Sequence, residues 1–132
     1  MTESRVNVRY MVDDVETAVA FYVKHLGFSL LSSAAPAFAD VARGNLRLLL
    51  SGAKSSAGRP MPDGRQPTPG GWNRFQLIVD DLPATVERLR AEGVPFRNEI
   101  VRGPGGAQIL IEDPAGNVIE LFQPAQHSPP RP

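Results

Sequence analysis

The sequence predicts an α+β fold of two tandem βαβββ modules, which form a cupped mixed β-sheet with the helices on its convex face. Two internal matches support this prediction. Val12-Asp13-Asp14-Val15 returns as Val79-Asp80-Asp81-Leu82 at an offset of 67 residues (79 minus 12), and Gly44-Asn45-Leu46 returns as Gly116-Asn117-Val118 at an offset of 72. Each copy belongs to the same order of strand, helix and three strands. One module cannot cover both faces of its sheet, so we expect the two to pack as one domain.

The first module, residues 5–51, begins with a strand and a helix. Residues 5–12 alternate apolar and polar side chains, which is the period of a half-buried strand. Asp13-Asp14 supplies a helix N-cap, apolar residues recur at helical spacing to Leu26, and Gly27 ends the helix. Three short strands follow, which we expect at residues 28–31, 37–42 and 46–50.

The second module, residues 72–124, repeats this pattern after a loop at residues 52–71, which contains four prolines and five glycines. We expect a helix that is capped by Asp80-Asp81 and ends at Gly93. The single domain then spans residues 1–124, and residues 125–132 are predicted to be a disordered tail. The expected strands of this module lie at residues 72–79, 95–101, 108–111 and 118–122.

The composition argues against several functional classes. The 132 residues carry 14 basic and 14 acidic side chains, and this zero net charge argues against a nucleic-acid partner. The absence of cysteine excludes disulfides, thiolate metal ligands and a cysteine nucleophile. No apolar run approaches the roughly 20 residues of a membrane span, so we expect no membrane partner and a cytoplasmic location.

The motifs at the two helix starts, together with one later turn, resemble a known family. Val12-Asp13-Asp14-Val15 with Leu26-Gly27-Phe28, and Val79-Asp80-Asp81-Leu82 with Asp113-Pro114-Ala115-Gly116-Asn117, resemble the vicinal oxygen chelate superfamily over about residues 5–124. This superfamily contains glyoxalase I, extradiol dioxygenases and the bleomycin-resistance binding proteins. The resemblance implies the βαβββ fold, a homodimer and a small-molecule ligand or substrate. It does not select a reaction, because one fold serves several chemistries.

Metal-dependent members of that superfamily hold a divalent metal with one residue from each of four strands. The motif spacing maps three of these positions onto Asn7, Arg74 and Glu120, and the repeat offset of 72 adds Leu48. Leucine has no donor atom, arginine is a permanent cation, and an asparagine amide is a weak oxygen ligand. We therefore expect no metal site and no cofactor, and a divalent metal is the alternative.

Strand alternation predicts which side chains face the ligand. Because Val6, Val8 and Tyr10 are expected to pack under the first helix, the residues between them face the concave side of the sheet. The same reasoning assigns Leu46, Leu48 and Leu50 to the concave side and leaves Arg47 on the helix side. Trp72 is a candidate to stack on a flat ligand. The predicted ligand-binding residues are Asn7, Arg9, Met11, Leu48, Trp72, Arg74, Gln76 and Phe122.

Two roles are open for Glu120, the only predicted catalytic residue. It is either the partner that neutralises Arg74, or a general base of the kind that related epimerases use. The preferred function is accordingly a small-molecule binding protein of the bleomycin-resistance type, which binds or sequesters an apolar or aromatic compound. The alternative is an enzyme of the same superfamily, a lyase, isomerase or dioxygenase-like member, that uses Glu120 as base or metal ligand.

Overall fold

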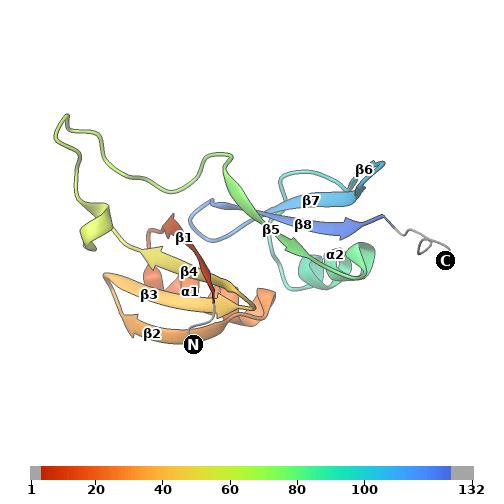
Figure 1. Cartoon of the computed structure of the whole chain (residues 1–132), viewed down its shortest axis with the longest axis horizontal. Coiled ribbons are helices and arrows are strands. Elements are labelled where there is room, and N and C mark those ends of the chain that lie inside the picture. The colour runs from red at the N-terminus through yellow and green to blue at the C-terminus, as the bar shows by residue number, and fades with distance from the viewer. Residues whose placement is uncertain (1–3, 126–132) are drawn as a thin grey trace. The chain divides into compact units, whose positions relative to one another are not determined.

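The computed structural model describes residues 4–125 and consists of two compact units, each with one helix and one four-stranded sheet (Figure 1). The first unit contains the chain up to Asn73 together with Asp113–Asn117, and the second contains Arg74–Glu112 and the chain from Val118 onward. The predicted α+β fold of two tandem βαβββ modules is confirmed. No helix in the described part of the chain is long and apolar enough to cross a membrane.

The first unit has the strand order β1-β4-β3-β2. β1 and β4 pair in parallel, and the other two pairs are antiparallel. A parallel pair needs a crossover between its strands, and here the helix and the β2–β3 hairpin provide it. The elements are β1 (Val6–Met11), α1 (Val15–Leu26), β2 (Ser29–Ala34), β3 (Phe38–Arg43) and β4 (Leu46–Ser51).

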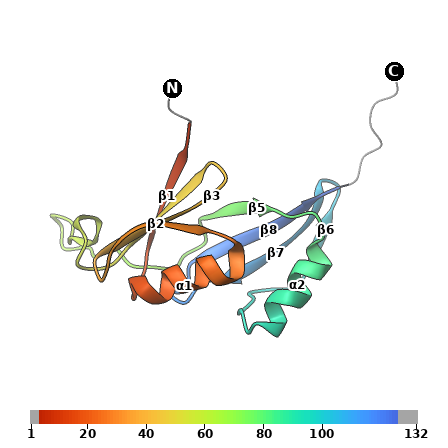
Figure 2. The same cartoon turned by 90° about the horizontal axis from the view of Figure 1, so that it is seen from below.

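Helix α1 begins and ends at the predicted residues. The Asp14 side chain accepts a hydrogen bond from the Thr17 backbone N–H, and Gly27 adopts the left-handed conformation (φ 72°) that ends the helix. Its buried stripe includes Phe21 and Tyr22, whose rings meet edge to face at 5.1 Å between centroids. Figure 2 shows the helix lying along one face of its sheet.

The second unit repeats this topology in the order β5-β8-β7-β6, again with a parallel first pair. Asp81 caps its helix by accepting from the Ala84 N–H, and Leu82, Val86 and Leu89 form the buried stripe. This helix also lies along one face of its sheet (Figure 2). The elements are β5 (Arg74–Ile78), α2 (Leu82–Ala91), β6 (Val101–Gly103), β7 (Gly106–Glu112) and β8 (Val118–Pro124).

The strand predicted at residues 95–101 is mostly absent. The segment makes a single isolated bridge, from Phe96 to Ile111, and regular pairing starts only at Val101. The reason is that the Leu110 N–H donates to the side-chain oxygen of Asn98 at 2.9 Å. The asparagine side chain thus takes the donor that a continuing strand would need.

The connection between β4 and β5 is irregular apart from one turn of 3-10 helix at Ser56–Gly58. It is held by its own hydrogen bonds, such as the one from the Ser55 hydroxyl to the Gly52 carbonyl at 2.7 Å. At the other end of the chain, Ala125 donates its N–H to the Gly105 carbonyl at 2.9 Å. The rest of the predicted tail lies outside the described residues.

The register of β4 corrects one predicted face. Leu48 lies opposite Val8 and Leu50 opposite Tyr10, so both leucines share the face that α1 covers, and neither has exposed surface. The prediction that Leu48 lines the face away from the helix is therefore wrong. Arg47 was predicted on the helix side, and it lies instead on the opposite face, which we call the helix-free face.

The repeat offset explains this error. The N–H of Val12 donates to the Ser51 carbonyl and that of Val79 to the Phe122 carbonyl, so these strands are equivalent at an offset of 71 (122 minus 51). The turn before β4 has two residues, 44–45, and the turn before β8 has five, 113–117. The shared Gly-Asn motif therefore aligns the strands one residue out of step, and a shift of one residue exchanges the two faces. Leu49 is thus the equivalent of Glu120.

A buried polar cluster in the first unit surrounds Asp113, which is 2% exposed. Its carboxyl accepts hydrogen bonds from the Tyr22 hydroxyl at 2.8 Å and from the backbone N–H groups of Ala115 and Asn117, both at 2.9 Å. The Asn117 amide donates to the Met11 carbonyl at 2.7 Å and accepts from the Gly70 N–H at 2.7 Å. The cluster therefore joins α1, the end of β1, the connection and the 113–117 turn.

Burial raises the pKa of Asp113 above its ordinary value, and the hydrogen bonds from Tyr22 and Asn117 offset part of this rise. Burial, followed by the charge of Asp113, raises the pKa of Tyr22 well above its ordinary value. The tyrosine therefore stays protonated and keeps donating. Because the folded state raises the pKa of Asp113, the contribution of this group to stability is full below its unfolded pKa and is lost as the pH rises.

Replacing Tyr22 with Phe is expected to lower the free energy of unfolding by about 1–3 kcal/mol at neutral pH, the usual cost when a buried acceptor loses its donor. Loss of the hydroxyl also raises the pKa of Asp113 further, so the deficit shrinks toward pH 4 as the carboxyl becomes protonated. Urea unfolding between pH 4 and 8 measures both effects. Asp63→Asn, which alters an exposed carboxylate, is the control. A deficit that does not change with pH contradicts this account.

Candidate functional site

The helix-free face of the second sheet carries the predicted side chains of β5 and β8. Gln76 lies opposite Glu120, and Ile78 lies opposite Phe122. The alternate residues of β8, Ile119 and Leu121, are at most 1% exposed on the face that α2 covers. The predicted alternation is therefore confirmed for this sheet.

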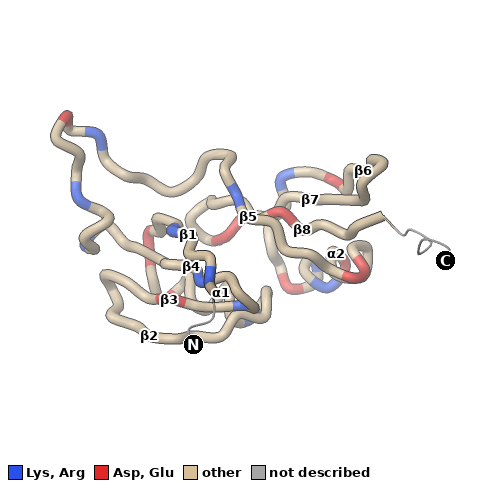
Figure 3. Tube along the Cα trace, viewed as in Figure 1, with Lys and Arg blue, Asp and Glu red and all other residues tan. Residues whose placement is uncertain are grey.

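Both carboxylate oxygens of Glu120 are engaged on this face. Arg74 Nε donates to Oε1 at 3.0 Å, and Gln76 Nε2 donates to Oε2 at 2.7 Å. Glu120 is 8% exposed, whereas the Arg74 side chain is 30% exposed. Figure 3 shows this arrangement as a basic segment of β5 beside an acidic segment of β8. The prediction that Arg74 and Glu120 pair is confirmed.

This geometry limits what Glu120 can do as a base. A general base must direct a lone pair at the proton that it removes. Here each oxygen already accepts a hydrogen bond, one from a guanidinium and one from an amide. Each oxygen therefore has one lone pair engaged and one left to accept a proton, on a side chain that belongs to a residue only 8% exposed.

The helix-free face of the first sheet carries Asn7, Arg9 and Met11 from β1, as predicted, because their neighbours Val8 and Tyr10 share the face of Leu48 and Leu50. Arg9 lies opposite Leu49, and its Nη1 donates to the Ser51 hydroxyl at 2.8 Å. Asn7 and Arg9 are exposed, and Met11 is half-buried.

Sequence reasoning missed a buried carboxylate on the same face. Asp40 is 3% exposed and accepts from the Ser32 hydroxyl at 2.6 Å and from Arg47 Nε at 2.7 Å. Burial alone would raise the pKa of Asp40, but these two hydrogen bonds outweigh it and lower the pKa. The signal in the sequence is a single acidic residue inside the apolar strand of residues 37–42.

The four positions that the family resemblance assigns to metal ligands do not fit a metal. Once the register is corrected, they are Asn7 and Leu49 in the first unit and Arg74 and Glu120 in the second. Leucine has no donor, arginine has no lone pair to give, and both oxygens of Glu120 are already engaged. Within residues 4–125, no three His, Cys, Asp or Glu side chains lie together in a group that could hold a metal ion.

Trp72 precedes β5 by two residues, and 67% of its surface is exposed. An exposed indole can stack on a flat ligand. This role stays a prediction.

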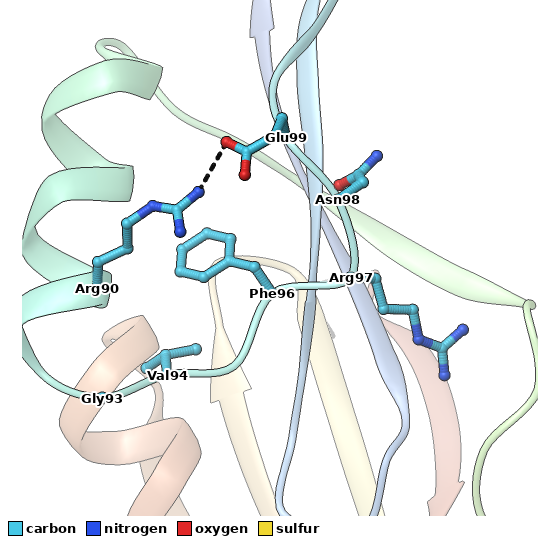
Figure 4. Close-up of a pocket in the computed structure, with 7 residues that line it drawn as sticks. All are labelled: Arg90, Gly93, Val94, Phe96, Arg97, Asn98 and Glu99. Carbon is cyan, nitrogen blue, oxygen red and sulfur yellow. Dashed lines mark hydrogen bonds and ion pairs between the residues drawn. The ribbon is translucent and has the colours of Figure 1, made fainter.

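One hollow, of about 250 Å³, is lined by the predicted residue Met11 together with Gln66 and Pro67. Two others lie away from the predicted residues. One, of about 450 Å³, lies between the end of α2 and residues 93–99 (Figure 4). The Arg90 guanidinium lies 4.5 Å from the centre of the Phe96 ring and 3.1 Å from Glu99, so its charge is already paired. A second and more apolar hollow, of about 520 Å³, lies between α1 and β2 and includes Val23 and Leu30.

Comparison with known proteins identifies the class to which these two modules belong. The family model described as Glyoxalase/Bleomycin resistance protein/Dioxygenase superfamily matches residues 5–121, and the chain belongs to this superfamily. Among curated proteins, no relative matches the sequence.

Three solved structures are similar to this chain over most of its length. The chain is 30% identical to TnmS3, an antibiotic binding protein from Streptomyces sp. CB03234, with a TM-score of 0.71 over 95% of this chain and 98% of that one. It is 27% identical to a superfamily member from Sphaerobacter thermophilus, with a TM-score of 0.73 over 93% and 98%. The lactoylglutathione lyase of Agrobacterium tumefaciens is 24% identical, with a TM-score of 0.73 over 92% and 94%, and shows likeness of fold alone.

Replacing Glu120 with Gln is expected to lower the free energy of unfolding by about 1–2 kcal/mol, because the half-buried Arg74 guanidinium loses its anion. A double-mutant cycle with Arg74→Met measures the interaction energy between the two side chains. The cycle is needed because Arg74→Met alone also leaves Glu120 without its cation. We expect a coupling of about 1 kcal/mol in urea unfolding. Additive effects of the two substitutions would show that the ion pair contributes nothing to stability.

Proposed function

We propose that this protein binds a small apolar or aromatic molecule on the helix-free faces of its sheets, and that it does so without a metal ion. The observation that carries the proposal is the engagement of both Glu120 oxygens by Arg74 and Gln76. The charge at the centre of this face is neutralised internally, and Ile78 and Phe122 lie on the same face. Apolar side chains around a few oriented polar groups are typical of small-molecule sites.

One relative supports a binding function. TnmS3, which is 30% identical over 95% of this chain, is an antibiotic binding protein. Membership of the superfamily is equally compatible with an enzyme, since the same fold serves both. The homodimer that the resemblance implies stays a prediction.

An enzyme that uses Glu120 as base or metal ligand is the alternative function. It requires the Glu120 carboxylate, each of whose oxygens already accepts one hydrogen bond, to act through its remaining lone pairs. A lyase, isomerase or dioxygenase-like member would meet this requirement if its substrate or metal reached those lone pairs.

An uncharged aromatic probe tests the proposed function. N-phenyl-1-naphthylamine is expected to bind the native protein, with a rise in probe fluorescence and in melting temperature, because a ligand of the folded state stabilises it. Ile78→Ser is expected to weaken this binding about tenfold, since it removes an exposed apolar contact from the helix-free face.

Leu30→Ser is the matched control, because Leu30 is 49% exposed, close to the 53% of Ile78, and lines the hollow between α1 and β2 instead. We expect its affinity for the probe to equal that of the unaltered protein. If Leu30→Ser weakens binding and Ile78→Ser does not, the ligand occupies the α1–β2 hollow and the proposed location is wrong.

Metal removal tests the alternative. Dialysis against EDTA, followed by addition of Mn²⁺ or Zn²⁺, is expected to leave the melting temperature and the probe affinity unchanged, because the four candidate positions offer no suitable donor set. A rise in melting temperature on adding metal that Glu120→Gln abolishes would contradict this and favour the enzyme.

A further inference from the structure

Three arginines on or beside the helix-free faces are neutralised by carboxylates. Arg47 pairs with Asp40 at 2.7 Å, and Arg74 pairs with Glu120 at 3.0 Å. Arg97, from the segment beside β7, pairs with Glu112 at 2.6 Å. These three cations therefore offer little net charge to a ligand.

Arg9, in the middle of β1, is not neutralised in this way. Its Nη1 donates to the hydroxyl oxygen of Ser51 at 2.8 Å, and this neutral group leaves the guanidinium charge in place. Within residues 4–125, no carboxylate lies within ion-pair distance of Arg9. A guanidinium carries five N–H donors in a planar fork, so most of its capacity is left for an oxyanion.

The surroundings of Arg9 also suit the rest of a ligand. Arg9 lies in the middle of β1, directly opposite the apolar Leu49, with Asn7 and Met11 two residues away on the same face. Strand pairing fixes the backbone of Arg9, and the hydrogen bond to Ser51 fixes its guanidinium. Besides the Arg47–Asp40 ion pair, the face thus presents the Arg9 guanidinium beside apolar groups and one amide.

We propose that Arg9 binds an acidic group of the ligand, so that the protein prefers aromatic or apolar molecules that carry a single negative charge. This inference rests on the proposed function and names the class of molecule that the first sheet takes. The acidic group accepts charge-assisted hydrogen bonds from Arg9, with the apolar body of the molecule against Leu49 and Met11. The exposed position of Arg9 makes this attraction sensitive to salt.

Two probes with the same ring system separate the two proposals. 8-Anilinonaphthalene-1-sulfonate carries one sulfonate, and N-phenyl-1-naphthylamine is its uncharged counterpart. The unaltered protein is expected to bind the sulfonate about tenfold more tightly at low salt, and this preference is expected to fall as salt rises. Arg9→Gln is expected to remove the preference, measured as the ratio of the two probe affinities.

Arg102→Gln is the matched control, because Arg102 is also an exposed strand arginine, lies on β6 of the second unit and undergoes the same change of net charge. It is expected to keep the preference for the sulfonate. Arg9→Lys keeps the charge but loses the planar fork, and is expected to retain part of the preference.

Each other outcome overturns a specific statement. If the uncharged probe binds and the sulfonate does not bind more tightly, Arg9 is not an anion site, while the proposed function stands. If neither probe binds, both the proposed function and the inference about Arg9 are wrong. If Arg9→Gln weakens both probes equally and Arg9→Lys restores neither, Arg9 supports the sheet and the inference is wrong.

Discussion

The first unit depends on one buried carboxyl, Asp113, and on the donors that surround it. A carboxyl that is 2% exposed is costly unless it is hydrogen-bonded, and here the Tyr22 hydroxyl and two backbone N–H groups supply the bonds. These partners come from α1 and from the 113–117 turn, so the helix and the turn are fixed by the same interaction. Because the turn sets where β8 starts, it also sets the register of the β7–β8 hairpin. The face on which Glu120 lies is therefore a consequence of the length of this turn.

Much of the fold could be predicted because its signals are local. Asp14 and Asp81 cap the helices through backbone groups three residues away, and the period of two in each strand separates its faces. What could not be predicted is how one strand aligns with its equivalent in the other module. The Gly-Asn motif occurs in turns of two and of five residues, and a motif match carries no information about turn length. Leu48 was therefore assigned to the wrong face, whereas β8, analysed from its own alternation, was assigned correctly.

The candidate site shows the same division between local pattern and distant partners. Arg74 and Glu120 could be predicted to meet, because the family resemblance maps both onto positions around one metal site, where a cation and an anion each need a counter-charge. Asp40 could not be linked to Ser32 and Arg47 in the same way, since the sequence offers several possible donors to one buried acid. The structure selects them through the pairing of β3 with β2 on one side and with β4 on the other. The hydrogen-bond partners of Asp40 are therefore determined by how the strands pair and not by the sequence of any single strand.

The Arg74–Glu120 pair also relates the fold to the proposed function. A carboxylate that is 8% exposed needs a positive partner, and in the metal-dependent members that the family resemblance describes, a divalent ion supplies that charge. A guanidinium at 3.0 Å meets the same electrostatic need from within the chain. It differs from a metal in chemistry, because it has no open coordination position with which to polarise a substrate. An arginine at this position therefore preserves the stability of the carboxylate and the shape of the face while leaving out the Lewis acid. This is the combination that the proposed binding function requires.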